Sequence, residues 1–408
     1  MSRIAYLANL FPVASEPYVA AEIRALRARG AQVIACSVRH PSSDEERDAL
    51  KQQTLYFTHV RARLIFRSLA LAAKHRRILA NIIKEAFSEK SARLSRRLRA
   101  LVHTALGIYF AALIEDRAIC HVHVHHGYFA SWIAMVAARV LNISYSITFH
   151  GSDLLLHGAF LKTKLEHCRF CTTISEFNRT VLVSAQPTTA EKIFICRMGV
   201  RVPHAEHSSN AYNPPFSIFA AGRLHPVKDF DFLLRGCRTL IDSGFDFRCR
   251  IAGEGNERKH LEELLDRLSL RDHVTLLGQQ SSIQMEAHYR IADLLVLTSR
   301  SEGIPLVLME AMARQQIVLA PRITGIPELV IDGKTGFLYA PGDLADFVRK
   351  VRMIERSTCF LQAIRRAASN HVVAHFERKK NVAGFCDLLI SQISAQSLPE
   401  PYAHPVLQ

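Results

Sequence analysis

The stretch SRSEGIPLVLMEAMA, residues 299–313, decides the fold of the C-terminal half of the chain. It follows a short apolar run at 293–297 that suits a buried parallel strand, and it ends in an apolar, alanine-containing segment that suits a helix. Gly303 permits a sharp turn between them, and Pro305 suits the first helical position because proline has no N–H to leave unpaired. The pattern predicts a strand, a tight turn and a helix whose free backbone N–H groups attract phosphate.

Two carboxylates lie in this unit, Glu302 in the predicted turn and Glu310 in the second turn of the helix. Beside a phosphate site, carboxylates suit the hydroxyl groups of a sugar or a ribose, because they accept hydrogen bonds. The alternative is that both are ordinary exposed acids. The position of Glu310 between Met309 and Ala311, inside an apolar helix, argues against that alternative.

This segment resembles the E-x7-E signature of the retaining glycosyltransferases of family 4, which have the GT-B fold of two Rossmann-like domains. The segment 220–230 (AAGRLHPVKDF) is similar to the family's G-R-x4-K loop, and 250–255, 274–280 and 324–343 match in order and spacing. The resemblance is specific over the C-terminal half and weaker over the N-terminal half. It implies an α/β protein whose two parallel sheets face each other across an interdomain cleft.

The length of 408 residues suits two or three domains. The polar, proline-containing segment 201–215 is the expected linker between an N-terminal acceptor-binding domain at 1–200 and a nucleotide-sugar-binding domain at 216–375. The resemblance implies that a last helix at 376–396 packs back on the first domain. The proline-containing tail at 397–408 is expected to be disordered.

The composition is that of a globular chain, with 49% hydrophobic and 22% charged residues. Nine scattered cysteines suit reduced, buried thiols in a cytosolic protein, and a lone CxxC at Cys168 and Cys171 favours core packing over zinc or redox chemistry. No signal-peptide pattern opens the sequence, and the longest apolar candidate for a membrane span, at 101–114, is too short. Membrane contact is therefore expected to be peripheral.

The net charge of +15 is concentrated in residues 61–99, where twelve Lys and Arg face two Glu. Apolar residues interleave with these cations at helical spacing, which predicts basic amphipathic helices that lie on an anionic membrane. The alternative is an ordinary helical pair with a packed apolar stripe and solvated charges. Nucleic acid is disfavoured because aromatic residues are sparse here and no nucleic-acid module is recognisable. The predicted membrane-surface cations are Arg67, Arg76, Arg77, Arg96 and Arg97.

The N-terminal half opens with a strand–helix–strand pattern that favours a parallel sheet and lacks G-x-G-x-x-G. Its first loop resembles a subset of the family with an FPxxSE loop, which would let Glu16 face the ligand; helix capping by Ser15 and Glu16 is the alternative. A second strand, within HVHVHHGYF at 121–129, ends at His126 and Tyr128, which are expected on the acceptor side. Three alternate histidines of this strand share one face, as zinc requires, but we favour ordinary strand packing and expect no metal.

A third strand is followed by HGSD at 150–153. A polar cluster with a glycine turn at the carboxyl end of a strand is where doubly wound sheets bind ligands. The cluster resembles the family's H-G-x-D loop, which contacts the acceptor or the transferred sugar. We therefore expect His150 and Asp153 to orient the acceptor; the alternative is that Asp153 only caps a helix.

The C-terminal half supplies the predicted donor site. A glycine turn with two cations, Arg223 and Lys228, follows a strand and suits a diphosphate, since arginine offers a fork of donors and lysine a point charge. The resemblance implies that Glu302 holds the sugar and Glu310 the ribose. The predicted catalytic residues are Glu302, Arg223, Lys228, His150 and Asp153. The predicted donor-binding residues are Gly222, Gly253, Gly255, Gly278, Gln279, Gly303, Ile304, Pro305, Leu306 and Glu310.

The function predicted from this resemblance is retaining, metal-independent and cofactor-free transfer of a hexose. The sugar would pass from a nucleotide-diphosphate-sugar to a glycan or glycolipid acceptor of polysaccharide biosynthesis, in the cytoplasm at the inner face of the plasma membrane. An epimerase would lack this E-x7-E pair, and a phosphorylase would have a longer chain. The alternative from another class is a non-catalytic basic protein on a GT-B scaffold that binds membranes or nucleic acid. It accounts for residues 61–99 and leaves the ordered C-terminal motifs unexplained.

Overall fold

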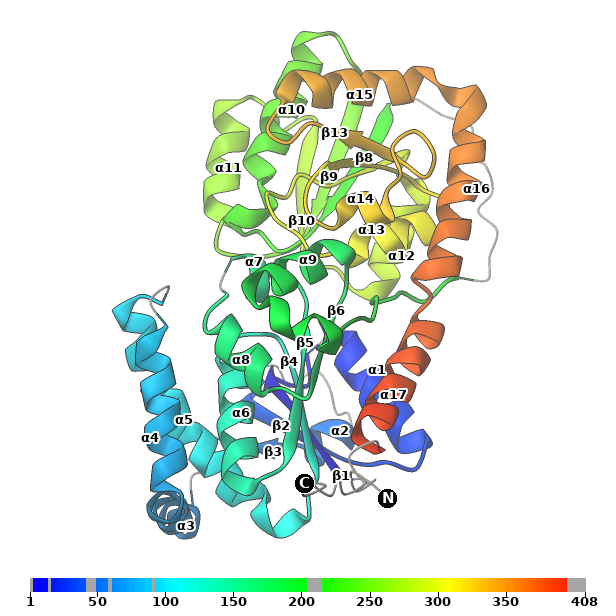
Figure 1. Ribbon diagram of the computed structural model, residues 1–408. Helices are drawn as coiled ribbons and strands as arrows, with labels where there is room; N and C mark the ends of the chain where they lie inside the picture. The colour runs from blue at the N-terminus through cyan, green and yellow to red at the C-terminus, as the bar shows by residue number, and fades with distance from the viewer. Residues whose placement is uncertain are drawn as a thin grey trace, which may run out of the picture. The chain divides into compact units, whose positions relative to one another are not determined.

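The computed structural model describes residues 3–13, 16–41, 49–57, 61–89, 92–156, 158–203 and 215–394. They form two compact units (Figure 1). The N-terminal unit comprises Met1–Thr173, Arg179–Cys196 and Val382–Gln408, and the C-terminal unit comprises Ile174–Asn178 and Arg197–Asn381. Each unit has its own parallel sheet, so the predicted α/β architecture of two Rossmann-like units is confirmed. Most of the expected linker and all of the expected tail, 397–408, lie outside the described residues.

The N-terminal unit is built on a sheet whose described strands run in the order β3-β2-β1-β4-β5-β6-β7, all parallel. The strands are β1 (Arg3–Leu10), β2 (Gln32–Arg39), β3 (Leu55–Tyr56), β4 (His121–His125), β5 (Ser144–Phe149), β6 (Phe170–Thr173) and β7 (Ile193–Ile195). The strand order reverses between β1 and β4. Ligands of such sheets bind beyond the carboxyl ends of the strands at this switch point.

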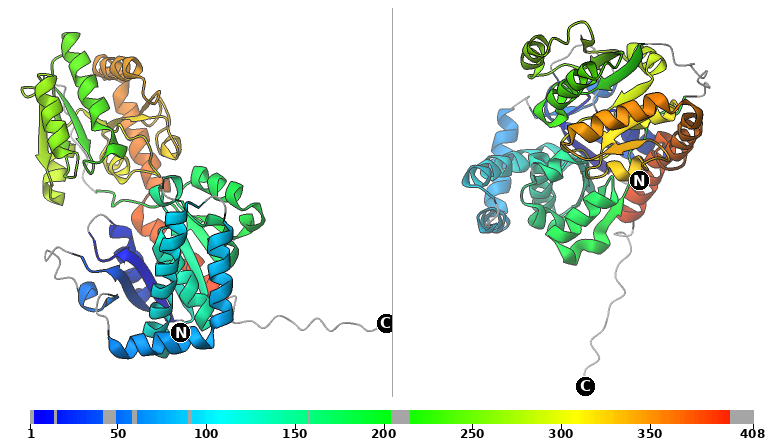
Figure 2. Two further views of the ribbon diagram at one scale, coloured as in Figure 1. Left: turned by 90° about the vertical axis from the view of Figure 1, so that its left-hand side faces the viewer. Right: turned by 90° about the horizontal axis from the view of Figure 1, so that it is seen from above.

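Helices cover both faces of this sheet, and the side chains of its central strands are buried on both sides. They are α1 (Pro17–Ala28), α2 (Ala49–Gln52), α3 (Ala62–Lys74), α4 (Arg76–Ser88), α5 (Leu94–Ile114), α6 (Phe129–Leu141), α7 (Ser152–Leu155), α8 (Leu161–His167), α9 (Glu176–Ala185), and the 3-10 turns η1 (Glu115–Arg117) and η2 (Pro187–Lys192). In Figures 1 and 2 the blue to cyan helices α3, α4 and α5 lie together at one side of this unit. Cys168 and Cys171 are buried in its core, as predicted.

Helix α5 is longer than the apolar segment expected at 101–114. Among the described residues, Leu94–Arg117 is the one segment long and apolar enough to cross a membrane by length and composition, and 44% of its apolar window is buried inside the unit. Its close partner is α6: a Cβ atom on Gly107 would lie 2.6 Å from the Cβ of Val136. Such close packing is what a core helix of a globular unit requires.

The C-terminal unit repeats the same design. Its described strands run in the order β10-β9-β8-β11-β12-β13, so the switch point lies between β8 and β11. The strands are β8 (Phe216–Ala221), β9 (Phe247–Ala252), β10 (Val274–Gly278), β11 (Leu294–Val296), β12 (Ile317–Pro321) and β13 (Phe337–Tyr339). Successive residues of β8 point to opposite faces of the sheet and so into two separate cores, Ile218 into one and Phe219 into the other.

Helices close each of these two cores. One includes residues of α10 (Phe230–Asp242), α11 (Arg258–Arg267) and α15 (Leu344–Arg356). The other includes residues of α12 (Ser282–Ile291), α13 (Leu306–Ala313), α14 (Ile326–Leu329) and α16 (Thr358–His375). The 3-10 turn η3 (Pro226–Lys228) precedes α10, and the last described helix is α17 (Arg378–Ser394).

Helix α17 begins in the C-terminal unit and ends in the N-terminal unit. In its second part, the ring of Phe385 lies 5.1 Å from the ring of His123 on β4. Asp387 accepts a hydrogen bond at 3.2 Å from Arg29, just after α1. Residues 382–394 therefore contribute to the packing of the N-terminal sheet.

Candidate functional site

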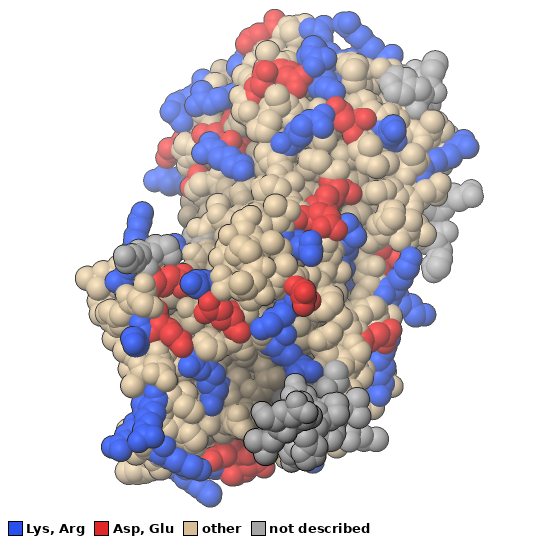
Figure 3. Space-filling model, in the orientation of Figure 1, with Lys and Arg blue, Asp and Glu red and all other residues tan. Residues whose placement is uncertain are grey.

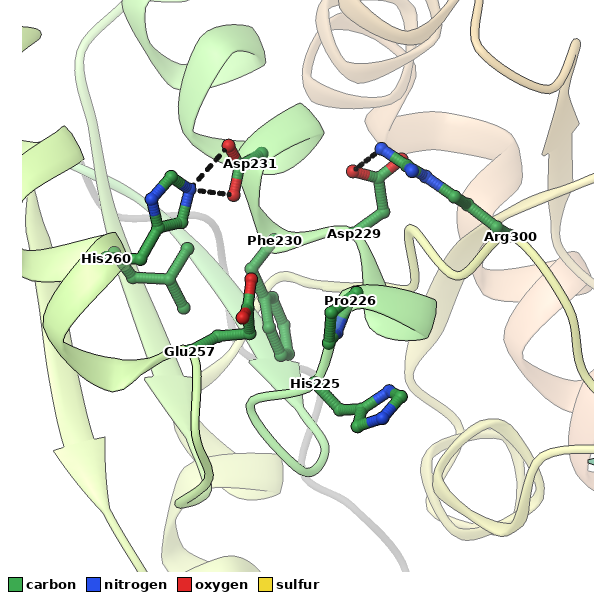
Figure 4. Close-up of a pocket in the computed structure, with 9 residues that line it drawn as sticks. His225, Pro226, Asp229, Phe230, Asp231, Glu257, His260 and Arg300 are labelled. Atoms are coloured by element: carbon green, nitrogen blue, oxygen red, sulfur yellow. Dashed lines mark hydrogen bonds and ion pairs between the residues drawn. The ribbon is translucent and has the colours of Figure 1, made fainter.

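Two loops meet at the switch point of the C-terminal sheet, one after β8 and the other after β11. The backbone N–H of Arg300 donates to the carbonyl of Val227 at 2.8 Å, and the hydroxyl of Thr298 donates to the carbonyl of Lys228 at 2.9 Å. The guanidinium of Arg300 donates twice to the carboxylate of Asp229, at 2.7 and 2.8 Å (Figure 4). These bonds fix the two loops against each other.

This contact brings together the side chains of Lys228 and Glu302. The ammonium nitrogen Nζ of Lys228 lies 2.5 Å from Oε1 of Glu302, and the two side chains are 20% and 13% exposed. The carbonyl of Glu302 accepts a hydrogen bond at 2.6 Å from the hydroxyl of Thr324, which follows β12. Two predicted catalytic residues that are far apart in the sequence thus form one ion pair.

Arg223 lies in the same loop as Lys228 and is exposed. Within the described part of the chain its guanidinium has no ion-pair or hydrogen-bond partner. Lys228 is already paired with a carboxylate, so Arg223 supplies the uncompensated charge at this edge of the sheet. A free guanidinium at the carboxyl end of a parallel strand suits a bidentate contact with a phosphate.

The glycines after β9 are required by the protein's own backbone. A Cβ atom on Gly253, whose φ is +140°, would lie 1.9 Å from the carbonyl oxygen of Gly222. A Cβ atom on Gly255 would lie 2.2 Å from the carbonyl oxygen of Leu224. The structure uses these glycines to press the loop after β9 against the loop after β8, and their contact with a ligand stays a prediction.

The third predicted donor loop follows β10. Gly278 has a φ of +74°, and its carbonyl accepts a hydrogen bond at 2.8 Å from the N–H of Gly253. Gln279 is exposed immediately after it. The ends of β8, β9 and β10 are therefore linked in series along the sheet edge.

Helix α13 begins where the loop after β11 ends. Pro305 has φ −74° and ψ 128°, so it caps the helix in an extended conformation, and Leu306 is the first helical residue. We predicted proline at the first helical position; its extended ψ moves it one place earlier. A Cβ atom on Gly325 would lie 2.5 Å from the carbonyl oxygen of Gly303, so the loop after β12 packs directly on this turn. Ile304 is buried, and the N–H groups that start α13 follow it.

Glu310 lies in the second turn of α13, as predicted, and is half-buried. Its Oε2 atom accepts a hydrogen bond at 2.8 Å from the hydroxyl of Tyr289 on α12. The guanidinium of Arg314 lies 5.0 Å from the centre of that ring. Burial, followed by the charge of Glu310, raises the pKa of Tyr289, so this residue stays a hydrogen-bond donor and fixes the carboxylate.

A separate cavity of about 160 Å³ lies beside the same loop (Figure 4). On its wall, Nε2 of His260 lies 2.9 and 3.0 Å from the two carboxylate oxygens of Asp231. Together with Glu257 these residues place three potential metal-ligand atoms within 4.8 Å of one another. Nε2 of His260 is hydrogen-bonded to Asp231 and would have to leave it to bind a metal. The expectation of no metal stays a prediction.

The N-terminal switch point, between β1 and β4, brings together the predicted acceptor-side residues. Oε1 of Glu16 lies 3.1 Å from Nε2 of His126, and the hydroxyl of Tyr18 lies 3.4 Å from the same nitrogen. The rings of His126 and Tyr128 are 5.7 Å apart. Glu16 precedes α1 but makes no side-chain cap, which favours its ligand-side interpretation over helix capping; Ser15 lies outside the described residues.

The pKa of His126 is raised even though burial of the ring acts to lower it. The hydrogen bond that the ring donates to Glu16 and the charges of Asp153 and Glu16 outweigh the burial. Its φ of +68° holds the residue in the left-handed region. His126 is therefore positioned to carry a proton at the edge of the sheet.

Asp153 holds the backbone of this edge. Its fully buried carboxylate accepts hydrogen bonds from the N–H groups of Gly127 at 2.7 Å, His150 at 3.1 Å and Gly151 at 2.7 Å. We expected this carboxylate to orient an acceptor directly. Because its oxygens are occupied by backbone donors, Asp153 instead positions the loops that carry His126 and His150.

His150 is buried rather than presented to solvent. Its Nε2 lies 2.9 Å from Nδ1 of His125, and burial together with the neighbouring histidines lowers its pKa well below the usual range. Nε2 of His125 lies 3.0 Å from Glu22, whose carboxylate also accepts a hydrogen bond from Tyr6. A buried polar chain therefore runs beneath the acceptor-side residues.

The histidines of β4 share one face, as predicted, and are buried. His121 is bonded to Ser144 and Ser146, both at 2.7 Å, and burial lowers its pKa to about 3. His123 is bonded to Ser146 at 2.7 Å and Thr148 at 3.1 Å. Glu22, His123 and His125 also lie within metal-ligand reach of one another, but the hydroxyls of β5 already bind both nitrogens of His123.

Sequence reasoning missed several residues that position the site. Tyr289 orients Glu310, Thr324 anchors Glu302, and Arg300 joins the two donor loops. Thr324 carried a signal because it opens the TGIPELV run, whereas Tyr289 and Glu22 lie inside helices where nothing in the local pattern marks them.

Comparison with known proteins can now be set beside these two switch points. Residues 204–371 match the model of the family described as Glycosyl transferases group 1. This match agrees with the resemblance deduced from the motifs of that segment.

Two curated relatives extend this comparison. The chain is 27% identical over 243 residues to the uncharacterized glycosyltransferase MJ1178 of Methanocaldococcus jannaschii, covering 59% of this chain and 66% of that protein. It is 35% identical over 173 residues to the putative colanic acid biosynthesis glycosyltransferase WcaL of Salmonella typhimurium, covering 39% and 43%. The chain thus spans less than two thirds of the length of these relatives.

Solved structures agree over almost the full chain. Sucrose-phosphate synthase from Thermosynechococcus elongatus aligns with a TM-score of 0.76 and 16% identity, covering 97% of this chain and 100% of that one. HepE from Anabaena, in complex with UDP and glucose, aligns with a TM-score of 0.69 and 16% identity, covering 96% and 100%. At this identity the likeness shows the fold, and the predicted GT-B fold is confirmed.

Proposed function

We propose that the protein is a retaining glycosyltransferase of polysaccharide biosynthesis. It would move a sugar from a nucleotide-diphosphate-sugar to a glycan or glycolipid acceptor, without a metal or other cofactor. The observation that carries this proposal is the contact of Lys228 with Glu302, at 2.5 Å, beside the partnerless guanidinium of Arg223. The family match of residues 204–371, and the biosynthetic role in the printed name of the WcaL relative, support it.

The chemistry requires the departing diphosphate to be stabilised as the anomeric carbon–oxygen bond breaks. Arg223, Lys228 and the N–H groups at the start of α13 supply positive charge and hydrogen bonds at one sheet edge. When the diphosphate engages Lys228, the carboxylate of Glu302 becomes free to accept hydrogen bonds from the sugar hydroxyls. The ion pair in the structure therefore stands in for the contacts of the bound donor.

Glu310 is assigned to the ribose hydroxyls. Tyr289 occupies one of its carboxylate oxygens, and the described residues supply no hydrogen-bond partner for the other. A carboxylate held this way can accept from a diol without reorganising. The acceptor oxygen would bond to the anomeric carbon on the face that the diphosphate leaves. Its proton would pass to a diphosphate oxygen, so no enzyme nucleophile is needed.

On the acceptor side, Glu16, His126 and Tyr128 would contact the incoming hydroxyl, and Asp153 would hold the loops that carry them. His126 and Glu16 form a charge-assisted pair that can orient a hydroxyl group. In this assignment His150 and Asp153 act as positioning residues, because one is buried against His125 and the other is occupied by backbone N–H groups.

The experiment is a screen of nucleotide-sugars by thermal shift and by release of nucleoside diphosphate. One donor is expected to raise Tm in the wild type. In Glu310→Ala that shift should be lost, whereas Tyr289→Phe, which removes only the hydrogen bond to the carboxylate, should keep most of it. NMR of the product anomer then tests retention, and unchanged rates with a chelator test metal independence. A folded wild type that binds none of the donors would refute the enzymatic proposal.

We also propose that the protein works at the surface of an anionic membrane. Phe66 and Leu69 of α3 are 71% and 62% exposed, although a packed helix would bury them. Lys and Arg side chains extend from the region of α3 and α4, at the lower left of Figure 3. An exposed apolar ridge flanked by cations matches the surface of an anionic bilayer.

The five predicted membrane-surface cations do not behave alike. Arg76 and Arg77 are exposed and have no partner among the described residues. Arg67 instead pairs with Glu115 and Asp116, and Arg97 donates to the backbone of Ala92 and Glu89. Arg96 donates to the carbonyl of Gly158 at 3.0 Å. The lipid-facing role therefore rests on Arg76 and Arg77 together with the apolar ridge.

The test is co-sedimentation with vesicles of phosphatidylglycerol and phosphatidylcholine. The double variant Phe66→Ser/Leu69→Ser should lose about 10-fold or more in binding. The matched control, Ile283→Ser, changes an even more exposed apolar residue in the C-terminal unit and should bind like wild type. Equal binding by all three proteins would remove the membrane proposal. Vesicle binding without any nucleotide binding would instead favour the non-catalytic alternative.

A further inference from the structure

A second cavity, of about 250 Å³, lies inside the N-terminal unit between α5, α8 and the loop after β4. Three cations line it: Arg96 and Arg99 of α5 and Lys164 of α8. Gly127 and Tyr128, which follow β4, form part of its wall, and the described lining residues include no acid. The cavity is therefore a positively charged pocket directly beside the predicted acceptor-side loop.

Lys164 is the unusual member of this set because its side chain is buried, with the residue only 1% exposed. Its ammonium donates to the carbonyl of Gly127 at 2.6 Å and to the carbonyl of Tyr128 at 3.3 Å. No carboxylate pairs with it among the described residues. Buried ammonium groups almost always have a counter-charge, because taking a charge out of water is costly. An ammonium that lines a cavity and has no direct ion pair points to an anion supplied from outside the chain.

The two arginines differ in how they are held. Arg96 donates to the carbonyl of Gly158 at 3.0 Å, which fixes its guanidinium at the rim. Arg99 is exposed, and its guanidinium has no partner within the described residues. An ammonium that keeps a third N–H and a guanidinium with no partner together offer donors in several directions, as a tetrahedral phosphate requires.

Helix α5 also connects this pocket to the exposed apolar surface. Leu94, Leu98 and Val102 are exposed and follow one another at intervals of four residues, so they form one stripe along the helix. Arg96 and Arg99, two of the three cations that line the pocket, belong to the same helix. A phosphorylated molecule with an apolar chain would find a charged pocket and an apolar stripe on one element.

We propose that this pocket binds the phosphate group of a phosphorylated acceptor, with Lys164, Arg96 and Arg99 as its donors. The assignment rests on the proposed function, because Tyr128 links the pocket to the loop that would meet the acceptor. The shared chemistry is a phosphate ester. It can belong to a lipid-linked glycan or to a water-soluble sugar phosphate, and the stripe on α5 favours the lipid-linked form.

The electrostatics of Lys164 agree with this assignment. Burial lowers the pKa of Lys164 to about 7; Glu89 and Asp153 act to raise it and Arg96 to lower it. A bound dianion favours the protonated amine, so anion binding should weaken as pH rises above neutrality. Neither carboxylate forms an ion pair with Lys164. The oxygens of Asp153 accept from backbone N–H groups, and Glu89 accepts a hydrogen bond from Thr163 at 3.3 Å.

The experiment titrates the full chain with inorganic sulfate, a phosphate mimic whose charge is constant between about pH 6 and about pH 9. Lys164→Met and Arg99→Gln should each weaken sulfate binding at the lower pH about 10-fold, and Lys164→Met should also lose the pH dependence. Lys162→Met, on the exposed side of the same helix, is the control and should behave like wild type. Arg99→Gln keeps the test decisive if Lys164→Met fails to fold, because the guanidinium of Arg99 has no hydrogen-bond or ion-pair partner among the described residues.

The second arm separates the sources of the phosphate. A lipid-linked acceptor would be supported if octyl phosphate binds more tightly than inorganic phosphate and the double variant Leu94→Ser/Leu98→Ser loses this advantage. Equal binding of the two phosphates would support a water-soluble acceptor. Sulfate binding unchanged in both cation variants would overturn the pocket. Nucleoside diphosphate binding is measured in parallel: if it persists, only this inference has failed, and if it is absent while sulfate binds here, only the proposed function has failed.

Discussion

The two switch points of this molecule have the same topology and opposite chemistry. In the C-terminal unit the loops after β8 and β11 meet through a lysine–glutamate pair with a free arginine beside it. In the N-terminal unit the loops after β1 and β4 meet through Glu16 and His126, above a buried network of histidine, tyrosine and glutamate. One edge carries permanent charge, whereas the other carries groups that gain and lose protons.

The difference matches the two ligands that the proposed function requires. Permanent cations suit a diphosphate, whose charge does not change near neutral pH, and they need glycine-rich loops packed backbone to backbone to hold them. A hydroxyl acceptor needs directional hydrogen bonds and a place for a proton, which histidine provides. The predictions below break each edge separately, so that the consequences of the two chemistries can be compared.

The largest effect is expected from Glu302→Gln at the permanently charged edge. The amide cannot hold the sugar hydroxyls or balance Lys228 as the carboxylate does, so the rate of donor turnover should fall about 100- to 1,000-fold. Glu262→Gln, a half-buried acid paired with Arg258 on α11 and outside the switch point, should stay within about 2-fold of wild type. Equal rates in the two variants would remove Glu302 from the catalytic machinery.

The next largest effect is on stability and concerns the loop contact at Gly253. Ala at this position meets a carbonyl oxygen at 1.9 Å with a φ of +140°, so Gly253→Ala should lower the free energy of unfolding by about 3 kcal/mol. Gly244→Ala is the matched control: its φ is +72°, but its Cβ atom would meet nothing within 4 Å. It should cost only about 1 kcal/mol in urea unfolding. Similar costs would mean that the loops move apart easily.

At the other edge, Asp153→Asn should lower the free energy of unfolding by about 2 kcal/mol. Asparagine keeps the shape of the side chain. Its amide nitrogen, however, cannot accept the hydrogen bonds that backbone N–H groups now donate to a carboxylate oxygen. Urea unfolding measures the change, and nucleoside diphosphate affinity in the folded fraction should be unaffected. A variant as stable as wild type would show that the loop N–H groups find other acceptors.

The smallest effect depends on pH. The pKa of His126 is higher in the folded protein than in the unfolded chain. The contact with Glu16 therefore contributes stability at pH values below the unfolded pKa, and this stability is lost as the pH rises through the folded pKa. Glu16→Gln should therefore cost about 1 kcal/mol at about pH 5.5 and clearly less at about pH 8.5. Glu191→Gln, an exposed acid without a partner among the described residues, should show no such difference. A pH-independent cost would mean that the pair is held by shape alone.

The same comparison explains what the sequence could predict. At the C-terminal edge the signals are local: a glycine turn, two cations and an acid each follow a strand, and the structure brings them together as expected. What the sequence does not contain is their mutual arrangement. Glu302 and Lys228 pair because the loops cross, and nothing within either motif encodes the bond from Tyr289 to Glu310.

The N-terminal edge is harder to predict from sequence because its side chains act through buried contacts. Asp153 reads as a ligand contact in sequence and is occupied by backbone N–H groups in the fold. Lys164 lies in an unremarkable polar segment, and only burial makes it unusual. The spacing of apolar residues predicts the amphipathic helices of the basic segment. It does not predict which cations stay free, because that depends on tertiary contacts such as that of Arg67 with Asp116.

The central claim is that the C-terminal switch point binds the diphosphate of a nucleotide-sugar, and calorimetric titration with UDP and GDP tests it most directly. The wild type is expected to bind at least one of them, and Arg223→Gln should weaken that binding about 10- to 100-fold, because a partnerless guanidinium has no structural role to lose. Arg235→Gln, an equally exposed arginine on α10, should bind like wild type. Equal affinity in all three proteins, or no binding to a folded wild type, would contradict the account.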